Sequence, residues 1–503
     1  MTSGSRERTE KLDKMASVFL KFLGKISPFL ITITILVIVP VLVAHGLIKI
    51  DPSIILALSA AIIPAYAAII AIPFTIALLH LQSKYGPEAT GILVRKLKAI
   101  FIVFGLIVLL SILFALVSII PYSVMLAAEI SIALAPILYF ASFIRNILSL
   151  SPTDIIKEIG FPEKPAELLR KGRVFETLGI YYRGFRLIKA CINDLVLHDQ
   201  LNFVLKVLNN SLIRIDWTQN ISEEKETGRL DLHGVLLNLT KWYALYVVDP
   251  IVVTHPKPSY YSLSRFIYSM TKVFIDAGMT MSGVFDEFLQ NTVKLSIAYH
   301  PNLDAAWYLY FQPILNTLSS KETLSRPEGL GILNYALPHA ICGGITIIAH
   351  ALNTLQGRSL LRRTKVSLWF YRIMEILREH PRILIHLLCH DEFGEVFMEI
   401  NEQTVMLGVV PLAIILAKLK ATIREMDIRE AKVADYCIRR LSKCIAELLD
   451  RNSLNFKVDG EKLVVVNREG EVVSEGIMNS EEMKAVNDYL RYLRRNYLLE
   501  HED

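Results

Sequence analysis

The sequence predicts an all-α membrane protein: four transmembrane helices, then a large and mainly helical cytoplasmic domain that ends in a small β-meander and a final helix. Mean hydropathy is +0.41 although 20% of the residues are charged, which fits a strongly apolar segment joined to a soluble one. The apolar segment lies early in the chain, because the acidic residues between Ile26 and Ile144 are only Asp51, Glu88 and Glu129.

Four apolar stretches are long enough to cross a bilayer. A hydrocarbon core of about 30 Å needs about 20 apolar residues in a helix, and a helix satisfies its own backbone polar groups there. The predicted spans are Phe29–Ile48, Ile54–Leu81, Ala99–Ile120 and Tyr122–Arg145. We therefore expect residues 26–147 to form a four-helix transmembrane domain in the plasma membrane.

The positions of lysine and arginine predict the orientation of these spans. Basic residues gather in the tail, residues 1–25, and in the loop between the second and third spans, whereas the other two loops carry Lys49 alone. Basic loops stay in the cytoplasm, so both termini are predicted to be cytoplasmic. Apolar residues at helical spacing in the tail indicate an interfacial amphipathic helix on the bilayer; a frayed tail is the alternative.

Two later apolar stretches, Gly331–Leu352 and Thr404–Leu416, are predicted to be core helices of the cytoplasmic domain. If both crossed the membrane, the arginine-rich segment between them would lie outside. The positive-inside rule opposes that topology.

Polar residues recur every seven positions along edges of the predicted spans, a spacing within about 20° of two helical turns. These residues are Ser59, Tyr66 and His80 of the second span, where Pro73 occupies the position between Tyr66 and His80, and Ser111 and Ser118 of the third. They predict a polar path through the membrane, or, alternatively, close helix packing through small and hydroxyl residues.

Glu129 lies inside the fourth predicted span. An ionised carboxylate is costly in hydrocarbon, so such a residue faces a bundle interior or a cavity. Two interpretations stay open: an ion-coordinating or titrating carboxyl, or a protonated, hydrogen-bonded or interface-reaching side chain.

Residues 148–451 have the pattern of one helix after another, and either a helical solenoid or a globular helical domain fits. Turn signals interrupt the pattern at Ser222–Gly228, Asp249–Tyr260, His300–Asp304 and Ser325–Gly331. In residues 452–503 the pattern changes to three short strands, Leu454–Val458, Lys462–Val466 and Glu471–Glu475. Ser480 is predicted to cap the final helix.

Four basic residues follow the last span closely: Lys164, Arg170, Lys171 and Arg173. Their position favours contact with anionic lipid headgroups, and a solvated helix face is the alternative. The net charge of +5 is modest and is not concentrated in a stripe, so no nucleic-acid partner is predicted.

The sequence contains no phosphate-binding loop, dinucleotide fingerprint or nucleophile elbow, so we predict no catalytic residue and no cofactor. His386 and His390 stand four residues apart, a spacing that can hold a metal on a helix, but no second ligand cluster accompanies them and no metal is predicted. The five cysteines form no CxxC pair, which fits a reducing compartment without a disulfide framework.

The stretch Phe74–Leu116 resembles a prokaryotic domain-of-unknown-function family of predicted membrane proteins. The resemblance is carried by an apolar helix that ends in Ser83-Lys84-Tyr85-Gly86-Pro87, a short amphipathic link, and a helix that contains Gly105. It covers about a tenth of the chain and lacks the downstream Asn-Asp-Pro motif of that family. The resemblance implies a multi-pass membrane protein of unassigned activity.

These features lead to two functional hypotheses. The first is a homo-oligomeric ion channel or transporter regulated by its cytoplasmic helical domain, which rests on Glu129 and the polar edges. The alternative is a membrane-anchored scaffold or sensor whose helical domain binds a cytoplasmic protein partner.

Overall fold

The structure is a computed structural model, and the chain divides into two compact units, Met1–Ile159 and Gly160–Asp503. It describes residues 38, 41, 42, 57, 61, 71, 75–83, 85, 150–193, 198–218, 226–254, 260–299, 302–354, 360–387, 390–404 and 406–498. The four predicted spans therefore lie almost entirely outside the described residues.

The described part of the first unit contains a helical stretch over residues 75–83 and the helix α5 (Pro152–Ile159). Tyr85 is buried, and its hydroxyl donates to the carbonyl of Leu150 at 2.8 Å. The start of α5 is capped, because the carboxylate of Asp154 accepts from the backbone N–H and hydroxyl of Ser151 at 3.1 and 2.7 Å.

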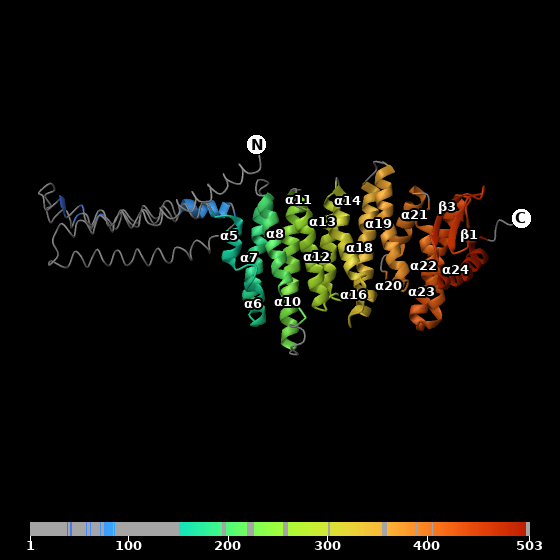
Figure 1. The fold of residues 1–503 in the computed structure, drawn as a ribbon, viewed down its shortest axis with the longest axis horizontal. Coiled ribbons are helices and arrows are strands. Elements are labelled where there is room, and N and C mark those ends of the chain that lie inside the picture. The colour runs from blue at the N-terminus through green and yellow to red at the C-terminus, as the bar shows by residue number, and fades with distance from the viewer. Residues whose placement is uncertain are drawn as a thin grey trace, which may run out of the picture. The chain divides into compact units, whose positions relative to one another are not determined.

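The second unit is built mainly from helices that follow one another along the stack in sequence order (Figure 1). Six of them form a first row in which each helix contacts the next. This row consists of α7 (Val174–Asn193), α10 (Glu226–Tyr243), α13 (Gly283–Ala298), α18 (Leu337–Thr354), α21 (His390–Gln403) and α23 (Ile428–Arg451).

A second row of helices packs against the first. It consists of α8 (His198–Ile213), α12 (Tyr260–Asp276), α15 (Gln312–Leu318), α19 (Leu360–Glu379), α22 (Val409–Thr422) and α24 (Ser480–Leu493). Two fully buried indoles, Trp307 of the π-helical segment η5 (Trp307–Phe311) that leads into α15 and Trp369 of α19, stack at 5.1 Å between ring centroids.

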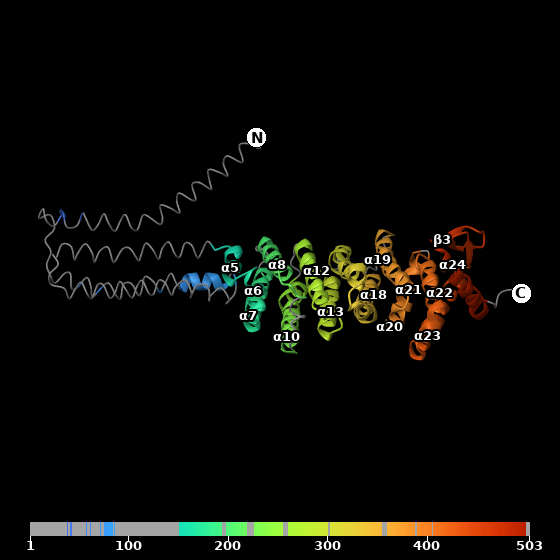
Figure 2. The same ribbon diagram turned by 60° about the horizontal axis from the view of Figure 1, so that its bottom comes forward.

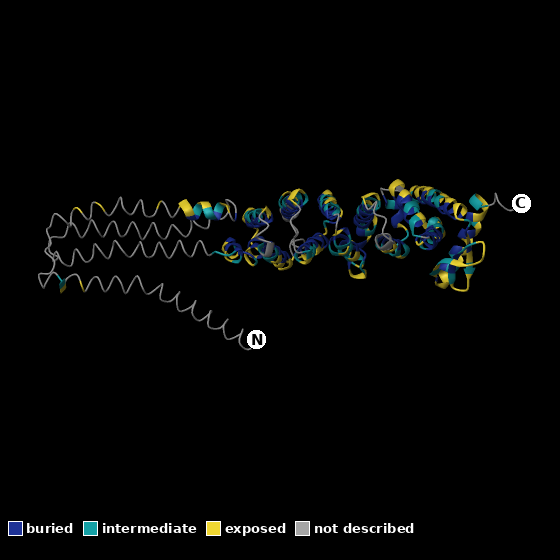
Figure 3. Cartoon of the chain, turned by 90° about the horizontal axis from the view of Figure 1, so that it is seen from above, coloured by how far each residue is buried: buried dark blue, intermediate teal, exposed yellow. Residues whose placement is uncertain are grey.

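Short helices complete the connections between the rows. They are α6 (Lys164–Arg170), α11 (Asp249–Thr254), α14 (Leu303–Ala306), α16 (Lys321–Leu324), α17 (Gly329–Gly331), α20 (Ile383–His386) and the 3-10 turn η7 (Ile423–Glu425). Each helix of the unit packs mainly on helices near it in sequence, and buried residues lie on the facing sides of the helices (Figure 3). Of the two arrangements that the sequence allowed, the structure has the helical solenoid.

Three helices of the stack contain a π-helical segment shortly before a proline: η3 (Ala244–Val248), η5 (Trp307–Phe311) and η6 (Ile332–Ala336). Each ends two residues before a proline: Pro250, Pro313 and Pro338. The residue just before each proline donates to the carbonyl five residues back. A proline has no N–H to donate and clashes with the carbonyl four residues back. The wider π-helical turn shifts the register of the backbone hydrogen bonds, and each helix can therefore continue through its proline.

The π-helical segment η3 explains why one helix boundary predicted from the sequence is wrong. The stretch Asp249–Tyr260 was expected to be a break, but the helix continues through η3 into α11 and ends at Thr254. The sequence pattern was misleading because Pro250 normally indicates a helix end.

Among the described residues, two helices are long and apolar enough to span a membrane: Leu232–Thr254 and Gly329–Thr354. Inside the unit, 50% and 56% of their apolar windows are buried. A helix that is apolar on most sides suits both a membrane span and a protein core. The predicted core stretch Gly331–Leu352 lies in the second of these, where α18 packs on α13 and α19.

The C-terminal end carries a three-stranded antiparallel sheet, as the sequence predicted (Figure 2). Its strands are β1 (Asn455–Asp459), β2 (Lys462–Val466) and β3 (Val472–Ile477), in the order β1-β2-β3. The π-helical segment η8 (Arg494–Leu498) follows α24. The cap of α24 is Asn479 and not Ser480. Asn479 forms a reciprocal capping box with Glu482.

Candidate functional site

The predicted polar path through the membrane cannot be located in the described part of the chain. Ser59, Tyr66, Ser111, Ser118 and Glu129 lie outside the described residues. His80 is described and is half-buried in the helical stretch over residues 75–83. The path therefore stays a prediction.

The predicted lipid-contact residues are all exposed at the start of the second unit. Lys164 and Arg170 lie on α6, and Lys171 and Arg173 follow it. The Nζ of Lys171 lies 2.5 Å from Glu167 Oε1. Arg173 is likewise paired, with Glu176. Lys164 and Arg170 have no ion-pair partner among the described residues, so they carry the free positive charge of this group.

The histidines considered as metal ligands do not share a helix. α20 ends at His386, Leu387 is extended with ψ 115°, and α21 begins at His390. The i, i+4 geometry that a helical site needs is therefore absent. Within the described ranges no group of three His, Cys, Asp or Glu side chains could hold a metal ion.

A set of exposed, mainly aromatic side chains lies on α12, on η5, which leads into α15, and on α19. We call it the tyrosine face, and it consists of Tyr261, Arg265, Tyr268 and Lys272 of α12, Tyr308 of η5, and Leu368 and Tyr371 of α19. Its aromatic and leucine side chains are 41% to 59% exposed. Tyrosine and arginine are enriched at protein interfaces, so this surface differs from an ordinary solvated one.

A cavity of about 250 Å³ hollows the tyrosine face between α12 and α15. Tyr268 and Lys272 line one side of it and Asn316 the other. Asn316 Oδ1 accepts from Arg372 Nε at 3.1 Å, which connects α15 to α19 beside this cavity.

The charges on the tyrosine face are unevenly paired. Asp276 is paired with Arg326 at 2.7 Å, and Glu375 with Arg372 at 2.9 Å. Arg265 lies over the ring of Tyr261, 4.4 Å from its centroid. Neither Arg265 nor Lys272 has an ion-pair partner in the described part of the chain, so the face offers free positive charge between its aromatic rings.

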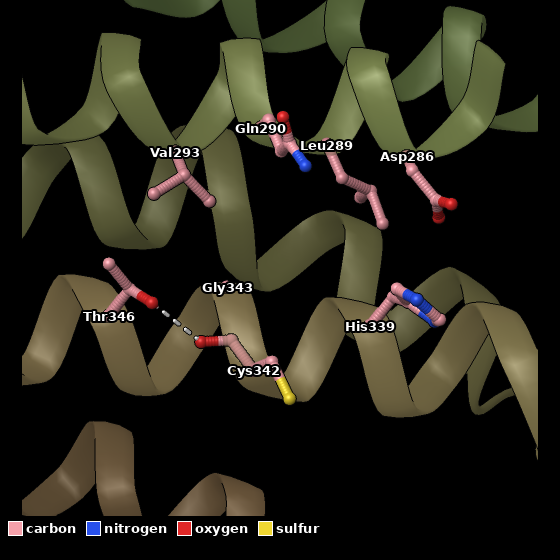
Figure 4. Close-up of a pocket in the computed structure, with 8 residues that line it drawn as sticks. All are labelled: Asp286, Leu289, Gln290, Val293, His339, Cys342, Gly343 and Thr346. Atoms are coloured by element: carbon pink, nitrogen blue, oxygen red, sulfur yellow. Dashed lines mark hydrogen bonds between the residues drawn. The ribbon is translucent and has the colours of Figure 1, made fainter. Parts of the chain in front are cut away.

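A second cavity, of about 270 Å³, lies between α13 and α18 (Figure 4). Its lining residues repeat the spacing i, i+3, i+4, i+7 on both helices, so one face of each helix forms a wall. These residues are Asp286, Leu289, Gln290 and Val293 of α13, and His339, Cys342, Gly343 and Thr346 of α18. We call this cavity the α13–α18 pocket.

Asp286 and His339 lie opposite one another at one end of this pocket (Figure 4). Tyr335 of η6 donates its hydroxyl to Asp286 Oδ2 at 2.5 Å. This hydrogen bond to Asp286 raises the pKa of Tyr335, with a smaller contribution from burial. The rings of Tyr335 and His339 contact one another at 4.3 Å between centroids, with their planes tilted by 36°.

The middle of the pocket depends on a close helix approach. A Cβ added at Gly343 would lie 2.9 Å from Val293 Cγ2, which is too close without a shift. Cys342, beside this glycine, is disulfide-bonded. The expectation of a chain without disulfides is therefore wrong at this position. Cysteine spacing alone cannot show which side chains the fold brings together.

Sequence reasoning missed both surfaces. The stripe of Tyr261, Arg265, Tyr268 and Lys272 can be found as the exposed side of an otherwise buried helix. Asp286 and His339 belong to helices about 50 residues apart, and no local pattern joins them.

No protein-family model and no curated protein matches the chain. Among solved structures, it is similar to one described as a "Circular tandem repeat protein with novel repeat topology and enhanced subunit contact surfaces". The two share 12% identical residues over 86% of this chain and 97% of that chain, with a TM-score of 0.31.

Proposed function

We propose that the protein is a membrane-anchored α-solenoid scaffold whose tyrosine face binds an acidic segment of a cytoplasmic protein partner. The four spans predicted from the sequence form the anchor in this proposal, with both termini in the cytoplasm. The resemblance of Phe74–Leu116 to a family of multi-pass membrane proteins agrees with such an anchor.

The tyrosine face carries this proposal. Helical solenoids expose long surfaces that bind partners, and binding energy at interfaces concentrates in tyrosine, tryptophan and arginine. Arg265 and Lys272 lie between exposed tyrosines without ion-pair partners among the described residues. Carboxylates of a partner would form ion pairs with these two cations. The nearby acidic side chains Asp276 and Glu375 are already paired with arginines of this chain.

Site-specific photo-crosslinking in native membranes tests the proposal. A photoreactive phenylalanine analogue replaces Tyr268 in the full-length protein, and a matched control carries it at Tyr436, an exposed tyrosine of the first-row helix α23. We expect a discrete protein adduct from position 268 and none from position 436. The double substitution Arg265→Glu and Lys272→Glu should abolish the adduct, because it replaces both free cations with like charges.

Two results would contradict the scaffold proposal. One is equal crosslinking from both positions, which would mean non-specific proximity. The other is an adduct that survives charge reversal or that contains nucleic acid.

A channel or transporter is the second candidate, and Glu129 in the fourth predicted span is the observation that favours it. In this proposal the protein is a homo-oligomer and the carboxylate faces the path of the ion. Reconstitution in liposomes should then show ion flux that falls in Glu129→Gln. Absent flux supports the scaffold, and unchanged flux in the variant would contradict the role of Glu129.

Contact with anionic headgroups is proposed as an accessory role of Lys164 and Arg170. Phe175, on the first turn of α7, is 90% exposed beside this group. An exposed aromatic ring next to basic residues suits the interfacial zone of a bilayer. If this contact exists, Phe175 is protected from hydroxyl-radical labelling in membranes that contain anionic lipid. Removal of that lipid should then increase the labelling of Phe175.

A further inference from the structure

The α13–α18 pocket presents acceptors without matching donors at the end where Asp286 and His339 lie. Asp286 Oδ2 accepts from Tyr335, but Asp286 Oδ1, although shielded from solvent, has no hydrogen-bond partner among the described residues. A shielded acceptor left without a donor is costly, and more so when it belongs to a carboxylate. The structure also pairs Asp286 with no lysine or arginine within its described part. A ligand that brings N–H donors and positive charge would remove both deficits.

His339 adds a second acceptor at the same end. Its Nδ1 lies 2.8 Å from the carbonyl oxygen of Tyr335. A carbonyl can only accept, so Nδ1 carries the hydrogen and donates it. In the tautomer with its hydrogen on Nδ1, the ring has Nε2 as an acceptor. The contact with the ring of Tyr335 and this hydrogen bond hold the ring in place at the pocket wall.

The rest of the pocket is small, and Gln290 and Thr346 are the other polar side chains in its lining. Leu289 and Val293 of α13 line the pocket, and Gly343 of α18 leaves room there that any side chain would fill. Thr346 turns its hydroxyl to the carbonyl of Cys342 at 3.0 Å, away from hydrogen bonding with a ligand (Figure 4). The volume of about 270 Å³ is just below the lower end of ordinary ligand pockets, about 300 Å³, so the ligand must be small.

We propose that the α13–α18 pocket binds a small primary amine with an apolar body. The ammonium group donates to Asp286 Oδ1 and to His339, and the apolar body lies against Leu289, Val293 and Gly343. Tyr335 is a positioning residue, because its hydroxyl holds the carboxylate and its carbonyl holds the histidine. This site is separate from the tyrosine face, and the proposal does not rest on the scaffold function.

Isothermal titration calorimetry on the full-length protein in detergent tests the site at pH 7. The probe is benzylamine, which is protonated at this pH, and benzyl alcohol is the neutral control of similar size. A charged hydrogen bond contributes about 1.5 kcal/mol or more, so benzylamine should bind about ten-fold tighter than benzyl alcohol. Equal affinity for the two probes, or no benzylamine binding at millimolar concentration, would overturn the proposal.

Two variants locate the binding at this pocket. Asp286→Asn keeps the shape and can still accept from Tyr335, but it removes the charge, so we expect about a ten-fold loss of benzylamine affinity. Asp488→Asn removes one carboxylate from α24, far from the pocket in sequence, and should leave the affinity unchanged. An unchanged affinity in Asp286→Asn, or an equal loss in both variants, would refute the site. The comparison of the two probes on the unaltered protein stands even if a variant folds poorly.

Discussion

At the scale of single residues, Glu482 joins the last helices of the solenoid. This carboxylate is buried on the first turn of α24. Arg378 of α19 donates to both of its oxygens, at 3.1 and 2.8 Å, and Lys418 of α22 lies 3.5 Å away. The same side chain completes the capping box with Asn479. One carboxylate thus connects three helices and begins one of them.

The pKa of Glu482 reports the balance at this site. Burial by itself raises this pKa, but hydrogen bonds from Arg378 and from the backbone of Asn479, with the charges of Arg378 and Lys418, lower it below the ordinary 4.5. A carboxyl whose pKa is lowered by folding contributes stability above its unfolded pKa, and this stability is lost as the pH falls through the folded value.

We therefore predict that the stabilising contribution of Glu482 to the C-terminal end is fully present above about pH 4.5 and declines as the pH falls further. Glu482→Gln should lower the free energy of local unfolding by about 1–3 kcal/mol at pH 7, measured by hydrogen exchange in α24. The difference from wild type should shrink as the pH falls below 4.5. Glu481→Gln, exposed on the same turn, is the control, and an equal loss there would assign the effect to the helix dipole alone.

At the scale of elements, glycines decide how closely the rows of the solenoid approach. At Gly343 an added Cβ would meet Val293 Cγ2 at 2.9 Å and Phe311 Cζ at 3.1 Å. At Gly234, inside α10, nothing lies within 4 Å of the same atom. The two glycines thus have different roles: the first allows close packing of α18, and the second only adds freedom to the unfolded chain.

Alanine substitutions should separate these roles. Gly343→Ala forces atoms apart in a packed contact and should destabilise α18 by about 1–3 kcal/mol. Gly234→Ala removes unfolded-state freedom and should stabilise α10 by about 0.5–1 kcal/mol. Hydrogen exchange of the two helices measures both effects. Opposite signs are expected, and protection of α18 that survives Gly343→Ala would show that the helices have room to relax.

At the scale of the whole second unit, stability is a sum over neighbouring contacts. Its helices pack mainly on those near them in sequence, so each repeat depends on the next and the ends need caps. At the C-terminal end this cap is the sheet with α24, which covers the almost wholly buried α22.

Removal of residues 452–503 should therefore destabilise the solenoid from that end. In the membrane-embedded protein without these residues, protection from hydrogen exchange should fall most in α22 and α23, less in α19, and not in α7 or α8. A nearest-neighbour stack predicts this gradient. A uniform loss along the unit would instead indicate one cooperative domain.

The C-terminal sheet and the helical content could be predicted from the sequence, because both follow from short-range patterns. Strands β1 and β2 are joined by a tight turn at Asp459-Gly460, and Gly460 has the positive φ of 58° that a tight hairpin turn needs. Prolines were the weak point of the helix predictions. Pro250 indicated an end, and only the π-helical register of η3 allowed the helix to continue.

The sequence by itself determined which segments are helix or strand and which stretches are apolar enough to cross a bilayer, since hydrophobic periodicity and backbone preferences act within a few residues. Only the tertiary structure decided that the helices form a solenoid, that Asp286 meets Tyr335, and that Arg378 reaches Glu482 across 104 positions. Such contacts depend on how whole helices pack, and packing between distant segments leaves no local pattern in the chain.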